Sequence, residues 1–129
     1  MHRILIAEDN KINQVVAAGT LKKLGYAVEI VDSGGDAVGA CLRTPFDAVL
    51  MDVMMPEMDG YQATARIRED EAIMGGAHIP IIGLSARAME GDREIALAAG
   101  MDDYLTKPLR AAELEDVLGR WIGAPITHR

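Results

Sequence analysis

The sequence contains one cysteine, and this scarcity excludes two kinds of stabilisation. With Cys41 alone among 129 residues, no disulfide can form within the chain, and a zinc site built from several thiolates is excluded. The apolar neighbours of Cys41 at helical spacing indicate a buried helix face in a reducing compartment. The fold must therefore rest on its hydrophobic core, and half of the residues are hydrophobic.

Basic residues and long apolar runs are also in short supply. Lys and Arg number 13 against 20 Asp and Glu, a net charge of -7, which argues against direct binding of nucleic acid or of an anionic membrane. The apolar run near the N-terminus has four residues before Glu8, too short for a signal peptide or a membrane span. We therefore expect a cytoplasmic protein without membrane insertion.

Five short apolar runs alternate with longer segments of helical periodicity. The runs predict strands at 3–7, 27–31, 47–51, 79–84 and 103–106. Asn10, Ser33 and Asp59 are candidate N-caps, and Gly25 and Gly100 are candidate residues just past helix ends. This alternation predicts a single α/β domain with a parallel sheet and helices on both faces.

The hydrophobic content of the strands predicts their order in the sheet. The runs 3–7, 47–51 and 79–84 are almost continuously apolar, as in strands covered on both faces. The run 27–31 alternates and 103–106 is short and mixed, so these two should lie at the edges. The most economical order is 2-1-3-4-5, a flavodoxin-like, doubly wound (βα)5 sheet. In that order ligands bind beyond the carboxyl ends of the strands, where the winding reverses.

Polar residues directly follow four of the predicted strands. They are Glu8 and Asp9 after the first strand, Asp52 after the third, Ser85 after the fourth and Lys107 after the fifth. Carboxylates gathered at one edge raise one another's pKa unless a cation neutralises them. Mg²⁺ prefers oxygen ligands and often binds phosphate oxygens as well. The pattern therefore points to phosphoryl chemistry.

The segments that carry these residues resemble the receiver domains of two-component response regulators. The resemblance runs from Arg3 to about residue 122 and is carried by 6–10, 51–60, 84–86 and 104–108. Further segments are similar to the receivers attached to hybrid sensor histidine kinases, namely 10–14, 88–94 and 99–104. We accordingly predict a receiver domain at 1–123 and a flexible tail at 124–129, and we also expect a mobile loop at 70–78.

The resemblance implies a role for each residue at the predicted edge. Asp52 would be the phosphoacceptor, and Mg²⁺ would be held by Glu8, Asp9, the Asp52 carboxylate and the backbone carbonyl of Met54. The Lys107 ammonium would offset repulsion between the attacking carboxylate and the phosphoryl oxygens.

Ser85 and Tyr104 would form the conformational switch of such a domain. Ser85 would donate a hydrogen bond to the phosphoryl group, and Tyr104 would move inwards with it. The resemblance also implies that the peptide bond between Lys107 and Pro108 is cis. Each site residue has an ordinary alternative: Asp52 as a turn or helix cap, Glu8 and Asp9 as solvated loop acids, Lys107 as a surface lysine, Ser85 as a strand-end hydroxyl, and Tyr104 as a packed edge-strand residue.

The first helix carries a candidate docking surface. Ile12 and Val15 should point away from the sheet, either to pack against the last helix or to dock a helical phosphodonor. The residues expected to face the sheet are Val16, Ala17, Thr20, Leu21 and Leu24.

Three function classes follow from this pattern. A phosphoryl-accepting receiver would have a histidine kinase or a histidine phosphotransfer protein as its partner, and a weak homodimer is left open. A pseudo-receiver that binds proteins without being phosphorylated is the alternative. A phosphatase is disfavoured because that family has a second aspartate where Met54 stands, so we expect no turnover of an external substrate. We expect output through protein contacts or onward phosphotransfer.

Overall fold

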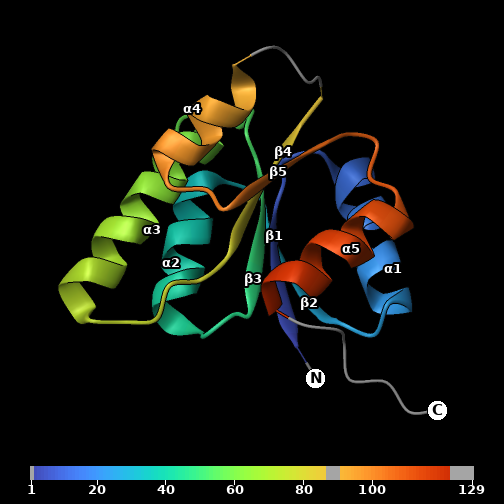
Figure 1. Ribbon diagram of the computed structural model, residues 1–129, viewed down its shortest axis with the longest axis horizontal. Helices are drawn as coiled ribbons and strands as arrows, with labels where there is room; N and C mark the ends of the chain where they lie inside the picture. Colours follow the sequence, from blue (N-terminus) through green and yellow to red (C-terminus); the bar gives the residue numbers. More distant parts are fainter. Residues whose placement is uncertain (1, 87–90, 123–129) are drawn as a thin grey trace.

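Five strands and five helices alternate along the computed structural model, which describes residues 2–86 and 91–122 (Figure 1). The strands are β1 (Arg3–Ala7), β2 (Ala27–Val31), β3 (Ala48–Asp52), β4 (Ile81–Ser85) and β5 (Asp103–Thr106). The helices are α1 (Lys11–Lys23), α2 (Gly34–Arg43), α3 (Gly60–Met74), α4 (Asp92–Ala99) and α5 (Ala111–Ile122). Among these helices, none has both the length and the apolar character needed to cross a membrane.

The sheet has the predicted order, β2-β1-β3-β4-β5, and each neighbouring pair is parallel. Leu5 in β1 lies opposite Glu29 in β2 and Val49 in β3, so the winding reverses at β1. Helices α1 and α5 cover one face of the sheet, and α2, α3 and α4 cover the other (Figure 1). The flavodoxin-like fold predicted from the apolar runs is therefore confirmed.

Alternate residues of the central strands serve two separate cores. Ile4 and Ile6 pack on the side of α1 and α5, whereas Leu5 and Met51 pack on the side of α2 and α3. Successive side chains of a strand point to opposite faces, which explains why near-continuous apolar runs are needed. Full burial of each such side chain contributes roughly 1.5–3 kcal/mol. β2 and β5 are partly exposed, as expected of edge strands.

The predicted helix ends are also present. The side chains of Asn10, Ser33 and Asp59 each accept the backbone N–H of the third residue beyond them. Such caps typically contribute about 1 kcal/mol. Gly25 and Gly100 follow α1 and α4 with φ of 97° and 108°, a conformation that favours glycine. The chain therefore enters and leaves these helices where local chemistry indicates.

Helix α3 shows that part of the predicted mobile loop was wrong. The loop was expected at 70–78, but α3 continues to Met74 and ends at Gly75 with φ of 66°. The Glu71 carboxylate accepts hydrogen bonds from the Arg68 guanidinium and from the Ile79 backbone N–H. These bonds tie the last turns of α3 to the approach to β4, so the helix is stabilised beyond the expected boundary.

The buried face of α1 also differs from the prediction. Val16 was expected to face the sheet, yet half of its side chain is exposed. Gln14 is buried instead, and it shares a face with Ala17, Ala18 and Leu21 at helical spacing. Because Gln14 is polar, the hydrophobic pattern did not identify it as the first residue of the buried face.

Cys41 of α2 was predicted to be buried, and it is partly rather than fully buried.

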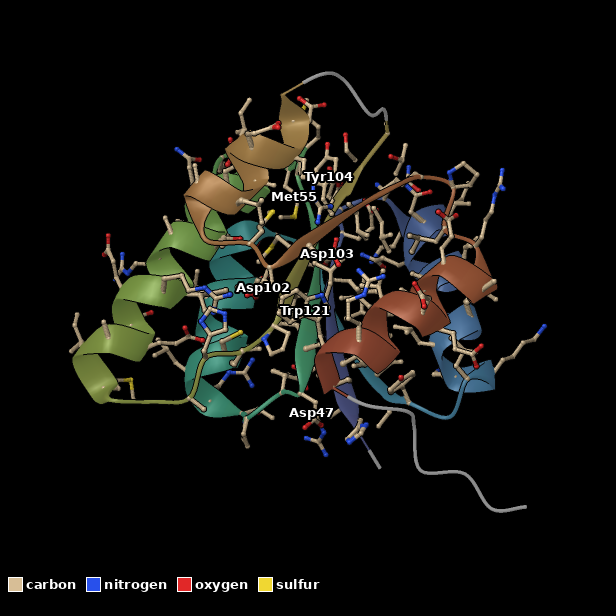
Figure 2. The ribbon with its side chains drawn as sticks, in the orientation of Figure 1. Asp47, Met55, Asp102, Asp103, Tyr104 and Trp121 are labelled. Carbon is tan, nitrogen blue, oxygen red and sulfur yellow. The ribbon has the colours of Figure 1, made fainter. Side chains whose placement is uncertain are left out.

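The fifth strand is anchored by two consecutive carboxylates, Asp102 and Asp103, shown with Trp121 in Figure 2. Asp102 accepts the N–H of Ile81 at 2.8 Å and a guanidinium bond from Arg68 at 2.7 Å. Asp103 accepts the indole N–H of Trp121 at 3.0 Å. The short strand is thus tied to both sides of the molecule.

The predicted tail, 124–129, lies outside the described residues, and the proposed domain boundary at 123 stays a prediction.

Candidate functional site

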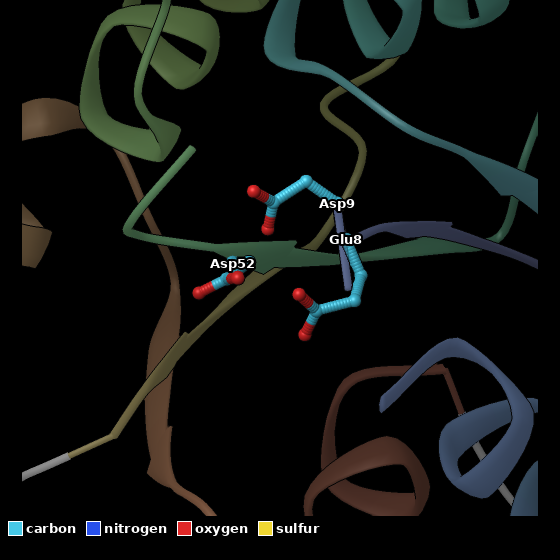
Figure 3. A group of neighbouring side chains, drawn as sticks. All are labelled: Glu8, Asp9 and Asp52. Atoms are coloured by element: carbon cyan, nitrogen blue, oxygen red, sulfur yellow. The ribbon is translucent and has the colours of Figure 1, made fainter. Parts of the chain in front are cut away.

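Three carboxylates meet at the carboxyl edge of the sheet, as the strand ends predicted. Glu8 and Asp9 follow β1, and Asp52 is the last residue of β3. Each offers an oxygen, and these oxygens lie within 4.8 Å of one another (Figure 3). Glu8 and Asp52 are buried, with 2% and 4% exposure, while Asp9 is exposed. The cluster therefore has a buried base and one side open to solvent.

Lys107 brings a positive charge into this cluster from the end of β5. Its Nζ lies 2.6 Å from Glu8 Oε1 and 3.2 Å from Asp52 Oδ2. The Lys107 backbone N–H donates to the Ser85 carbonyl at 2.6 Å, which fixes the chain beside β4. Burial lowers the pKa of Lys107, but its bonds to Glu8 and Asp52 outweigh this and raise it. The ammonium is therefore held charged between the two buried carboxylates.

The pKa values of the two buried acids shift in opposite directions. Burial raises the pKa of Asp52, and the hydrogen bond and negative charge of Glu8 raise it further, to about 6. Burial also acts to raise the pKa of Glu8, but bonds from Asp52 and Lys107 bring it below its usual value. Negative charge at Asp52 is therefore less favourable than on an isolated aspartate. A cation of charge two would offset the repulsion between these acids, and the all-oxygen donor set fits Mg²⁺.

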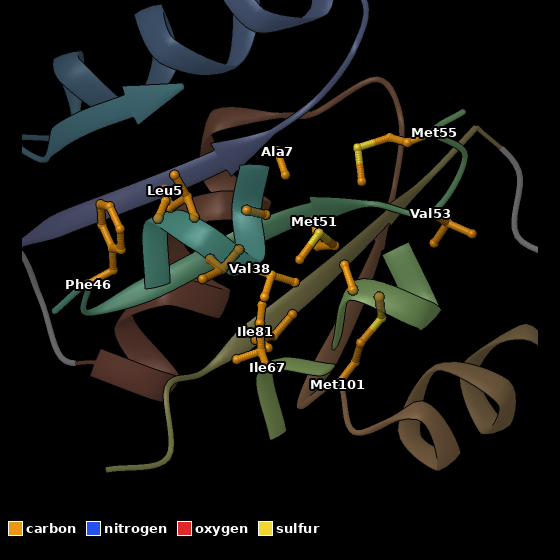
Figure 4. Close-up of a cluster of buried hydrophobic side chains, with 14 of the residues drawn as sticks. Leu5, Ala7, Val38, Phe46, Met51, Val53, Met55, Ile67, Ile81 and Met101 are labelled. Carbon is orange, nitrogen blue, oxygen red and sulfur yellow. The ribbon is translucent and has the colours of Figure 1, made fainter. Parts of the chain in front are cut away.

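The loop after β3 places the main chain beside the Asp52 carboxylate. Val53 and Met55 are buried and point into the core, as Figure 4 shows. Met54 between them has an exposed side chain, and its backbone N–H donates to Asp52 Oδ1 at 3.3 Å. Gly60 begins α3 so close to β3 that an added Cβ would lie 2.3 Å from the Asp52 carbonyl oxygen. The loop is therefore fixed at both ends around the site.

Ser85 and Tyr104 occupy neighbouring strands near the same edge. Ser85 ends β4, is buried, and pairs in register with Thr106 of β5. Tyr104 is half-buried, and its hydroxyl donates to Asp92 of α4 at 3.5 Å. An added Cβ at Gly83 would meet the Tyr104 ring at 3.1 Å, so β4 and this ring are closely packed. The switch role of Ser85 and Tyr104 stays a prediction.

The peptide bond between Lys107 and Pro108 is cis, as the resemblance implies.

The candidate docking residues of α1 are exposed near this edge. Ile12 and Val15 are 74% and 71% exposed, so the alternative that they pack against the last helix is wrong. The residues of α5 that are buried are Leu114, Val117 and Leu118, and they pack in the core shared with β1 and β3. The docking role of Ile12 and Val15 stays a prediction.

The sequence interpretation missed Gln14, which contacts the acidic turn. Gln14 Nε2 donates to the Glu8 carbonyl at 2.6 Å and to Asp32 Oδ1 at 2.6 Å. The available signal was the spacing of Gln14 from Ala17 and Leu21, which places an amide on the buried stripe. The sequence interpretation treated that stripe as apolar and did not consider a buried amide.

Comparison with known proteins finds a matching family model and similar proteins. The family model for the response regulator receiver domain matches residues 4–119. The sensor histidine kinase GacS of Pseudomonas protegens is 40% identical over 127 residues, which cover 98% of this chain and 14% of that protein. This chain thus spans about a seventh of the length of that relative.

Solved structures give the same result. The receiver domain of the sensor histidine kinase PA1611 of Pseudomonas aeruginosa is 48% identical, with a TM-score of 0.85 over 95% of this chain and 98% of that one. That crystal structure has a magnesium ion coordinated in its active-site cleft. A chain in the co-crystal structure of yeast Ypd1, a histidine phosphotransfer protein, with the receiver domain of Ssk1 is 30% identical, with a TM-score of 0.88 over 94% and 88%.

Receiver domains are modules of two-component and phosphorelay signalling rather than enzymes that turn over an external substrate. The matched residues include the acidic edge described above and all five strands except Arg3, the first residue of β1. With its predicted fold confirmed and relatives at these identities, the chain belongs to the response regulator receiver domain family.

Proposed function

We propose that this domain accepts a phosphoryl group on Asp52 in a Mg²⁺-dependent reaction and changes its surface in response. The donor would be a phosphohistidine of a histidine kinase or a histidine phosphotransfer protein. The observation that carries the proposal is the position of Lys107 Nζ, 2.6 Å from Glu8 and 3.2 Å from Asp52, beside the open carboxylate of Asp9. Such an arrangement of charges suits a dianionic phosphoryl group and a metal ion.

The transfer would be an in-line displacement by the Asp52 carboxylate. A carboxylate oxygen forms the new bond to phosphorus while the phosphorus–nitrogen bond of the phosphohistidine breaks, and its electron pair returns to the imidazole. The Met54 N–H holds Asp52 Oδ1, which orients the carboxylate. The Lys107 ammonium beside Oδ2 reduces the repulsion that the incoming phosphoryl oxygens meet.

Glu8, Asp9 and Asp52 would hold Mg²⁺, together with the backbone carbonyl of Met54. When bound, the ion would neutralise charge on the carboxylates and on the phosphoryl oxygens. Before it binds, the Lys107 ammonium reduces the repulsion among the acids through its contacts with Glu8 and Asp52.

The surface change would begin at Ser85. Its hydroxyl would donate to a phosphoryl oxygen on Asp52 and draw the start of the following loop inwards. Tyr104 on the adjacent strand contacts Asp92 of α4, so its movement would alter how α4 packs. A phosphoryl group shifts this equilibrium only by its difference in affinity for the two states, so we expect a partial shift.

The exposed pair Ile12 and Val15 would dock the helical surface of the phosphodonor. The yeast complex of a phosphotransfer protein with a receiver domain makes such a partner chemically reasonable. The pseudo-receiver alternative is less well supported, because Glu8, Asp52 and Lys107 are all present and in contact. Cytoplasmic location and a weak homodimer stay predictions.

Mass spectrometry after incubation with acetyl phosphate and Mg²⁺ tests the proposal. We expect the wild-type chain to gain one phosphoryl mass, and the gain to vanish when Mg²⁺ is chelated. Asp52→Asn should abolish it, whereas Asp116→Asn, an exposed change on α5, should leave it intact. A wild-type chain that stays unmodified would contradict the proposal and favour the pseudo-receiver. An Asp52→Asn variant that is still modified would show that Asp52 is not the phosphoacceptor.

A further inference from the structure

Gln14 is a buried amide that links two loops beside the acidic edge. It lies in the first turns of α1 with 6% of its surface exposed. Both donors of its Nε2 group are used, one on the Glu8 carbonyl and one on Asp32 Oδ1, each at 2.6 Å. A buried amide pointing to these two acceptors has a defined orientation.

The accepting carbonyl belongs to the peptide between Glu8 and Asp9. That peptide determines the direction in which the chain leaves β1, and therefore where the Asp9 carboxylate lies relative to Glu8. The Glu8 N–H belongs to the preceding peptide, and it donates to the Val31 carbonyl at 3.1 Å. Asp32 follows Val31 at the end of β2. Gln14 thus joins the acidic turn to the neighbouring strand end, because it bonds to both.

The acidic turn needs such a link, because its carboxylates repel one another. Lys107 contacts Glu8 and Asp52, but among residues 2–86 and 91–122 no ion pair reaches Asp9, which is exposed. An uncharged amide can hold the turn without neutralising the negative charge that attracts a cation. A lysine in its place would add a competing positive charge.

We propose that Gln14 is a positioning residue of the metal site, which holds the Glu8–Asp9 turn in the geometry that both carboxylates need to bind a divalent cation. The proposal rests on the metal-dependent function proposed above. Hydrogen-bond partners of metal ligands commonly change metal affinity by 10–100-fold when they are removed, so we expect an effect of about tenfold.

The test measures Mg²⁺ dissociation constants by amide chemical-shift titration of the full chain. Gln14→Met keeps the length of the side chain but removes the donors, and it should weaken Mg²⁺ binding about tenfold. Asn13→Leu makes a comparable polar-to-apolar change one residue earlier and should leave the dissociation constant unchanged. Thermal unfolding without Mg²⁺ is recorded for each variant, since a purely structural role would change stability and not affinity.

A second pair of variants keeps the test decisive if Gln14→Met does not fold. Asp32→Asn and Asp32→Ala remove the same charge, but the asparagine retains an acceptor for Gln14. We expect the alanine variant to bind Mg²⁺ more weakly than the asparagine variant. Equal dissociation constants in this pair, or wild-type affinity in folded Gln14→Met, would overturn the positioning role. If the wild-type chain fails to bind Mg²⁺, the metal site itself is wrong, and the role of Gln14 falls with it.

Discussion

Two acidic sites of this domain, the cluster at the carboxyl edge and the single carboxylate of Asp103, differ in how their negative charge is balanced. At the carboxyl edge of the sheet, Glu8, Asp9 and Asp52 converge, and Lys107 contacts two of the three. In the part of the chain that the structure describes, no other ion pair is made to these carboxylates. This cluster carries more negative charge than its protein partners balance.

Asp103 at the start of β5 is the opposite case. Its Oδ1 accepts from the Tyr104 N–H at 2.9 Å and from Arg93 at 3.2 Å. Its Oδ2 accepts from Arg120 and from the Trp121 indole N–H, each at 3.0 Å. Four donors thus surround one carboxylate, and they belong to α4, β5 and α5.

The pKa values of Asp52 and Asp103 move in opposite directions. Burial raises the pKa of Asp52 to about 6 with the help of Glu8. Burial also acts to raise the pKa of Asp103, but bonds from Trp121, Tyr104 and Arg93 outweigh it and lower the pKa. A satisfied buried acid stabilises the fold, whereas an unbalanced cluster is suited to binding a cation or a phosphoryl group.

The largest expected effect is the loss of phosphorylation in Asp52→Asn, with a gain in stability. Removing one of three crowded carboxylates relieves repulsion, so we expect the free energy of unfolding to rise by about 1 kcal/mol. Urea unfolding without Mg²⁺ measures this change in the free energy of unfolding, and Asp116→Asn is the control. A variant less stable than the wild type would contradict the idea that the cluster is unbalanced.

The second effect is the destabilisation caused by removing the satisfied carboxylate. Asp103→Ala removes the acceptor of four hydrogen bonds, two of them from guanidinium groups, and we expect a loss of about 3 kcal/mol. Asp116→Ala removes the other carboxylate bonded to Arg120 at an exposed site and should cost well under 1 kcal/mol. Similar losses in both variants, measured by urea unfolding, would remove the distinction between the two acidic sites.

The third effect concerns the metal. Mg²⁺ at about 100 times its dissociation constant should stabilise the wild-type chain by about 2.7 kcal/mol, because it binds the folded state. The shift in melting temperature should disappear in Asp9→Asn and persist in Asp116→Asn. Equal shifts in both variants would show that the ion acts elsewhere on the surface.

The smallest effect is the pH dependence that Asp103 contributes. Because its folded-state pKa is lowered, Asp103 stabilises the fold above its ordinary pKa of 3.8, and this stability is lost as pH falls through the folded-state pKa. The difference in unfolding free energy between the wild type and Asp103→Asn should therefore narrow as pH is lowered below 3.8. A difference that stays constant with pH would show that charge does not matter at this site.

The convergence of the site could be predicted from the sequence because it depends on local patterns. Apolar runs fix which strands are central, and the carboxyl ends of parallel strands meet at one edge. Glu8, Asp9 and Asp52 therefore had to lie together once the order 2-1-3-4-5 was inferred. The position of Lys107 after the last strand followed in the same way, and both expectations are confirmed.

The tertiary structure decided the contacts that link distant segments. Gln14 is buried because Asp32, 18 residues away, and the Glu8 carbonyl accept its amide protons. Asp103 is stabilised by Trp121, also 18 residues away. Hydrophobic periodicity reports which face of an element is buried, but it carries no information about which polar group will meet a buried donor. That match is determined only when the elements pack, because hydrogen bonds depend on distances and angles that no local pattern specifies.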